Sequence, residues 1–163
     1  SYGLKANHFE VADASIPLDV YPDERYQRIV KMMPHNVLQA AIRITGTHVH
    51  IGMPDHDTAL RVHGRVVHAA AGLWLAGDGS DGERKKLYEV VSPAYRARSY
   101  SSWNEFHDHA YSAGFSEDPR KNWQDVRISA HGTIEFRVFG TTSRTKKIVN
   151  WARRCRELCL ASM

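Results

Sequence analysis

The chain is poor in cysteine and lacks long apolar runs, and each shortage excludes a class of protein. Of its 163 residues only Cys155 and Cys159 are cysteine. They lie four apart in a helical pattern, so we expect them to pack as small apolar side chains rather than to form a disulfide. The apolar stretch "VVHAAAGLWLAG" contains a histidine and is shorter than the roughly 18 residues of a membrane span. No signal peptide is evident, and we predict a cytoplasmic protein with no membrane partner.

The bulk composition is that of an ordinary globular protein. Hydrophobic residues make up 42% of the chain and charged residues 25%, which predicts one domain over residues 1–163. The net charge is +4, and the basic residues are spread along the chain instead of forming a cluster. This distribution suits a small anionic ligand at least as well as nucleic acid, so we predict no nucleic-acid partner.

Local patterns predict an alternation of helices and short strands. A helix begins after Asp23 and ends near Pro34, and a strand follows over roughly 40–53. Helical periodicity covers 55–76, capped by Asp55 or Asp57, whereas 84–100 is ambiguous. Further helices are predicted over 103–113, after Ser101 or Ser102, and over 143–162. Between them, "WQDVRIS" and "TIEFRVF" are joined by "AHG", which is typical of a hairpin.

Three strand segments carry charged residues at every second position. In "HVH" the two histidines, His48 and His50, share one face. The same rule puts Asp125 with Arg127 in "DVR", and Glu135 with Arg137 in "EFR". The residues between them are apolar, so the pattern predicts an α+β fold in which an antiparallel β-sheet has helices packed on one face.

The charged face has the composition of a site for a divalent cation and polyphosphate. Glutamate and histidine are metal ligands, and the planar guanidinium matches phosphate or carboxylate in a bidentate manner. The ordinary alternative is a set of cross-strand ion pairs, such as Glu135 with Arg127. An ordinary solvated face would more often mix Lys, Thr, Ser and Glu, so the pattern favours the ligand site.

Several segments, taken in order, resemble a known family. They are "RYQRIV", "GTHVHIGMPDHDTALRV", "YRARSYSSWNEF", "NWQDVRIS" and "GTIEFRVFGTT". Each is weak alone, but the ordered set is similar to the type 2 glutamate–cysteine ligases, also called carboxylate–amine ligases. Amidoligases are similar as well, and glutamine synthetase is a more distant relative. The resemblance runs from about residue 23 to the C-terminus and implies a glutamine synthetase/glutamate–cysteine ligase-like fold.

The resemblance also implies a reaction and its cofactors. Such ligases use ATP and Mg²⁺ (or Mn²⁺) to phosphorylate a carboxylate, and an amine then displaces phosphate from the acyl phosphate. The expected substrates are small carboxylates and amines, among them amino acids. An ATP-dependent carbon–nitrogen ligase is therefore the expected enzyme.

Family roles are carried over onto the matching residues. The resemblance implies that His48 and Glu135 hold metal and that Arg137 stabilises the transferring phosphoryl group. Arg127 is the second expected catalytic residue. ATP or substrate is expected at the remaining four positions: His50, Arg96, Trp123 and Asp125.

The acidic residues expected to complete the metal site are missing from the front of this sequence. Family members begin with a strand of clustered glutamates, whereas the acids near the start of this chain are Glu10, Asp13 and Asp19. One glutamate and two imidazoles suit Mg²⁺ poorly, because Mg²⁺ prefers oxygen ligands. We therefore expect the N-terminal acidic strand to be absent here, and a homo-oligomer or a partner chain to supply acidic metal ligands.

Other functions remain open. A non-catalytic ligase-fold subunit or ligand-binding module, which needs a partner chain for activity, would also explain the missing acids. A cupin-like metal site uses H-x-H but needs a nearby glutamate, and "IGMPDHD" offers aspartates only. A nucleic-acid module rests on "YRARSYSSW" alone, which is one short basic and aromatic segment.

Overall fold

The structure is a computed structural model that describes residues 8–18 and 21–163. Asp19 and part of the loop expected over 1–22 lie outside these ranges. In chain order the elements are α1 (Glu24–Met32), α2 (His35–Arg43), β1 (Thr47–Gly52), α3 (His56–Val66), η1 (Val67–Ala69), α4 (Ala70–Gly77), α5 (Glu83–Val91), α6 (Trp103–Ser112), η2 (Pro119–Lys121), β2 (Val126–Ile128), β3 (Thr133–Phe139) and α7 (Thr145–Leu160). The protein is therefore α+β, as predicted. Among the described residues, no helix has both the length and the apolarity needed to cross a membrane.

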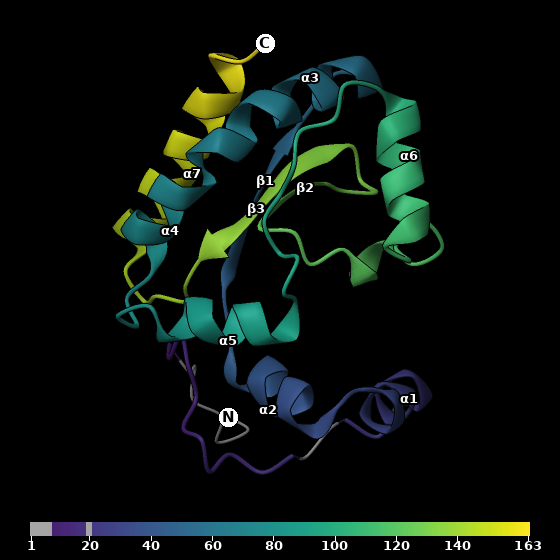
Figure 1. Ribbon diagram of the computed structural model, residues 1–163. Coiled ribbons are helices and arrows are strands. Elements are labelled where there is room, and N and C mark those ends of the chain that lie inside the picture. The colour runs from purple at the N-terminus through teal and green to yellow at the C-terminus, as the bar shows by residue number, and fades with distance from the viewer. Residues whose placement is uncertain (1–7, 19–20) are drawn as a thin grey trace.

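The three strands form one antiparallel sheet in the order β1-β3-β2, with β3 in the centre (Figure 1). Glu135 on β3 faces His50 on one side and Arg127 on the other. The register shifts between Thr47 and Val49, where β3 carries one more residue than β1. Such a bulge bends a strand and redirects side chains, and it lies here beside Arg137.

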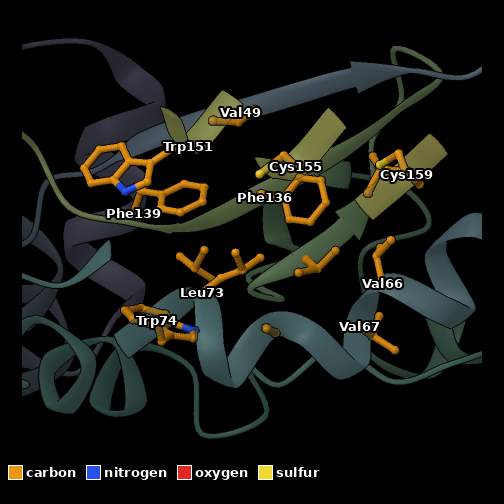
Figure 2. Close-up of a cluster of buried hydrophobic side chains, with 14 of the residues drawn as sticks. Val49, Val66, Val67, Leu73, Trp74, Phe136, Phe139, Trp151, Cys155 and Cys159 are labelled. Carbon is orange, nitrogen blue, oxygen red and sulfur yellow. The ribbon is translucent and has the colours of Figure 1, made fainter. Parts of the chain in front are cut away.

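The apolar face of the sheet is covered by α3, α4 and α7 (Figure 1). The side chains of Ile134, Phe136 and Val138 are fully buried. All three belong to the core cluster, and Figure 2 shows Phe136 there with Leu73, Val66, Cys155 and Cys159. The cysteines are free and buried, as predicted, and burial raises the pKa of Cys155 to about 12. The alternation of polar and apolar residues along the strands thus predicted correctly which face of the sheet packs against the core.

Helix starts follow the expected capping residues. Asp23 accepts a hydrogen bond from the backbone N–H of Arg25, Asp55 from that of Thr58, and Ser102 from that of Glu105. Each satisfies a backbone donor in the first turn that has no partner within the helix. These caps set where α3 and α6 begin, and both helices border the pocket described below.

One predicted element was wrong in its first half. The expected strand over 40–53 begins only at Thr47, because residues 35–43 form α2. This helix follows Pro34 and buries Leu38 and Ala40. Its contacts with α5 favour the helix over an extended chain, and periodicity could not reveal them. The ambiguous stretch after residue 83 begins as α5 and continues as an irregular segment.

Candidate functional site

Glu135 lies at the centre of the polar face, and its side chain is only 2% exposed. Its Oε2 accepts a hydrogen bond from Nε of Arg127 at 2.6 Å, and its Oε1 accepts one from Nη1 of Arg137 at 2.8 Å. Nδ1 of His48 lies 3.2 Å from Oε1, and Nε2 of His50 lies 3.8 Å from it. The predicted clustering of these five residues is therefore confirmed, and so is the Arg127–Glu135 ion pair of the ordinary alternative.

The electrostatics of this cluster follow from one buried carboxylate between two guanidinium groups. Burial alone would raise the pKa of Glu135. Hydrogen bonds from His48 and Arg127, with the charges of Arg127 and Arg137, outweigh it and hold this pKa well below its usual range. Burial lowers the pKa of His50, so its imidazole is largely neutral near pH 7. Glu135, Arg127 and Arg137 together carry one net positive charge.

Backbone carbonyls of the loop before β2 hold Arg127, and Tyr88 of α5 holds Arg137. Nη1 of Arg127 donates to the carbonyl of Pro119 at 3.1 Å and also to that of Asn122. Nε of Arg137 donates to the hydroxyl of Tyr88 at 3.1 Å, and that hydroxyl donates to the carbonyl of Trp123. The guanidinium of Arg137 lies 5.6 Å from the centre of the Trp123 ring. Trp123 thus supports Arg137 from one side.

A buried arginine that the sequence gave no reason to select holds the bulge of β3. Arg84, 2% exposed, donates to the carbonyls of Arg137 and Val138, at 3.0 Å each, and to that of Thr45 at 2.7 Å. A Cβ at Gly46 would come within 2.6 Å of its Nη2, so the glycine leaves room for this guanidinium. Arg84 therefore satisfies backbone acceptors beside the site. Its sequence context, "ERKK", is that of a solvated helix, which is why the pattern missed it.

The cluster opens into a pocket of about 1080 Å³. His48, His50, Arg127, Glu135 and Arg137 line its charged end. Nη2 of both arginines makes no hydrogen bond to another described residue, so these donors are available to an anion. A guanidinium edge of this kind matches a carboxylate or a phosphoryl group.

Three of the predicted ligand-binding residues do not line the pocket. Asp125 does not share a face with Arg127, because it precedes β2 and its carboxylate is buried toward α4. It accepts hydrogen bonds from the indole of Trp74 at 3.1 Å and from the backbone N–H of Ala97 at 2.9 Å. Burial raises the pKa of the Asp125 carboxyl, although these hydrogen bonds act to lower it.

Arg96 is exposed, and its guanidinium donates a hydrogen bond to the hydroxyl of Tyr95. The residues that line the pocket include neither Asp125 nor Arg96, and they do not include Trp123.

The described residues do not by themselves fit a divalent cation. Both oxygens of Glu135 are hydrogen bonded to arginine, and no group of three or more His, Cys, Asp or Glu side chains in 8–18 and 21–163 could hold a metal ion. Glu10 instead accepts from the backbone N–H of Gly79, and Asp13 from that of Ser15. Mg²⁺ requires several oxygen ligands in near-octahedral geometry. The cluster suits an anion better than a cation.

Comparisons with known proteins point to one family. The chain is 26% identical over 154 residues to a protein of Solibacter usitatus (strain Ellin6076) named "Putative glutamate–cysteine ligase 2", which covers 86% of this chain and 40% of that relative. Proteins of the same name from Gloeobacter violaceus (strain ATCC 29082 / PCC 7421) and Roseiflexus sp. (strain RS-1) are 30% and 27% identical, over 77% and 80% of this chain. No family model and no solved structure matches the chain.

The matched region is a part of each relative. The chain spans about two fifths of the length of the curated relatives it matches. The ordered motifs of the sequence, the cluster around Glu135 and several relatives of one name agree with one another. The chain belongs to the glutamate–cysteine ligase 2 family.

Proposed function

We propose that the protein carrying this chain is an ATP-dependent carboxylate–amine ligase in which these residues bind the reacting anionic groups. The observation that carries the proposal is the buried Glu135 between Arg127 and Arg137 at the end of the pocket. The relatives are named as ligases, which favours small-molecule substrates. A fixed pair of guanidinium groups is suited to stabilising charge that develops on phosphoryl oxygens.

The proposed reaction has two displacement steps. A carboxylate oxygen of the substrate attacks the γ-phosphorus of ATP, and ADP leaves. The amine then attacks the carbonyl carbon of the acyl phosphate, phosphate leaves with the bonding electrons, and the nitrogen loses a proton. Arg137 and Arg127 neutralise the phosphoryl and carboxylate oxygens in both steps. Neutral His50 is placed to accept the amine proton, since its ring is half-exposed at the same end of the pocket.

Glu135 serves in this proposal to orient the two arginines. Because its carboxylate accepts from Nε of Arg127 and Nη1 of Arg137, both guanidinium planes have a fixed direction. The metal ligand roles expected for His48 and Glu135 would require further carboxylates. A partner chain, or another part of the protein to which this chain belongs, is the proposed source of these acids.

The experiment is an assay of phosphate release from ATP with Mg²⁺ and a mixture of carboxylates and amino acids. Arg137→Ala should abolish most turnover while Arg154→Ala, a surface arginine of α7 that is 64% exposed, should not. Equal turnover of both variants would refute the assignment.

A non-catalytic binding module is the second candidate. It is favoured because the described residues contain no group of three or more His, Cys, Asp or Glu side chains that could hold a metal ion. Titration of ATP and small carboxylates separates the two. Tight binding without phosphate release, in the protein with its full coding sequence, would support the module and reject the ligase.

A further inference from the structure

The pocket has a second wall whose character differs from the charged end. This wall consists of side chains of α6 and the segments near it: Trp103, Phe106, Ala110, Phe115, Met53 and Ala59. We call it the α6 wall. Figure 1 shows α6 on the side of the sheet away from α4 and α7. The proposed chemistry uses none of these residues.

The α6 wall is an ordered array of rings. Phe106 lies between Trp103 and Phe115, with ring centres 5.3 Å and 6.0 Å away. Edge-to-face contacts of this kind fix the orientation of each ring. Phe115 and Ala110 are buried, whereas Trp103 and Phe106 are only partly covered and so present part of their surface to the pocket.

Trp103 also has an unpaired donor. Its indole Nε1 is buried and finds no hydrogen-bond partner among the residues that the structure describes. Buried donors in folded proteins are paired in the great majority of cases, and an exception calls for an explanation. This atom is shielded from the pocket as well, so Trp103 offers a ligand apolar ring surface and no donor.

The volume of the pocket is large for a small polar amino acid. At about 1080 Å³ it slightly exceeds the range of roughly 300 to 1,000 Å³ for pockets that hold drug-sized ligands. A ligand held only at Arg127 and Arg137 would leave the α6 wall in contact with water. Covering apolar surface is favourable in proportion to its area, so a ligand that reaches this wall gains affinity.

We propose that the substrate carboxylate bound at Arg127 and Arg137 belongs to an acid with an aromatic or similarly bulky apolar group, which packs on the α6 wall. Phe106 and Trp103 are then the residues that determine specificity. This inference rests on the proposed function, because it takes the carboxylate to lie at the charged end. It adds that a short polar acid is a poor ligand.

The test is calorimetric titration with 3-phenylpropanoate, propanoate and glutarate. We expect 3-phenylpropanoate to bind at least about tenfold more tightly than either of the others, since a buried ring contributes well over one power of ten. Phe106→Ala should remove this preference and leave propanoate unchanged. The matched control is Tyr111→Ala, which removes a ring of α6 that is 74% exposed and outside the pocket lining. Trp103→Leu is a second variant in case Phe106→Ala does not fold.

The outcomes separate this inference from the proposed function. Equal binding of all three acids, lost in Arg127→Ala, would overturn the α6 wall specificity and leave the anion site intact. Binding of none of them, nor of ATP, would overturn the proposed function itself. If Phe106→Ala weakened AMP binding more than 3-phenylpropanoate binding, the wall would hold a nucleotide base, and the inference would be wrong.

Discussion

The two faces of β3 have different roles: one packs in the core, and the other carries charged side chains that line the pocket. Ile134, Phe136 and Val138 enter the core, while Glu135 and Arg137, which lie between them in sequence, form the charged end of the pocket. The apolar face is stabilised by packing that any well-shaped set of aliphatic and aromatic residues could supply. The polar face depends on particular atoms, because each oxygen of Glu135 meets a different guanidinium. Replacing a residue on the polar face should therefore lower activity, whereas replacing its neighbour on the apolar face should lower the free energy of unfolding.

The largest expected effect concerns the polar face. Arg137→Ala should lower ligase turnover by roughly 10³-fold, the scale for losing an arginine that stabilises a phosphoryl group, which corresponds to about 4 kcal/mol. Steady-state phosphate release would measure this. Circular dichroism should show a folded protein, and unchanged turnover in that folded variant would break the comparison.

The matching change on the apolar face is Phe136→Ala. Because the ring is fully buried, we expect the free energy of unfolding to fall by about 3 kcal/mol or more. Urea unfolding would measure the loss, with Leu75→Ala as a control, since Leu75 is 86% exposed and should change stability by less than about 0.5 kcal/mol. A loss of under 1 kcal/mol for Phe136→Ala would contradict the core assignment.

The next largest effect is the pH dependence of stability that the buried His63 produces. Burial lowers the pKa of His63 to about 4, although a hydrogen bond with the carbonyl of Val126 opposes the shift. The unfolded chain binds the proton at a pKa of about 6.5. Stability should therefore be full above pH 6.5 and fall as the pH drops toward 4, by about 2 kcal/mol at pH 5.

Comparing the wild type with His63→Gln isolates this contribution from that of the other histidines. Unfolding free energies at pH 7.5 and pH 5 should differ less in the variant than in the wild type. Equal pH dependence in the two proteins would show that His63 is not the buried titrating group.

The smallest effect tests the link between α5 and the polar face. Tyr88→Phe removes a hydroxyl that accepts from Arg137 and donates to Trp123. The loss of these bonds should cost about 1 kcal/mol, measured as weaker binding of phosphate or a small carboxylate at the arginines. An equal loss in Tyr95→Phe, whose hydroxyl bonds Glu89 and Arg96, would indicate a general effect on packing.

Much of the site was predictable because side-chain direction in a strand is a local property. The spacing in "HVH" and "EFR" predicted one shared face for His48, His50, Glu135 and Arg137, and the structure brings them together. Asp125 shows the limit of this rule. It lies one residue before β2 begins, and Trp74 with Ala97 draws its carboxylate toward the core. A short strand end is not constrained by the alternation.

The sequence by itself determined the polarity of each strand, the cap of α1, the caps of α3 and α6 to one of two residues each, the packing of the two cysteines and the family. These follow from periodicity, local hydrogen bonding and ordered motifs, all of which act over a few residues. The tertiary structure alone decided that Arg84 reaches the bulge of β3, that α2 replaces the first half of a strand, and that the α6 wall and the arginines line one pocket. Each depends on contacts between segments far apart in the chain, and these contacts leave no mark in the local pattern.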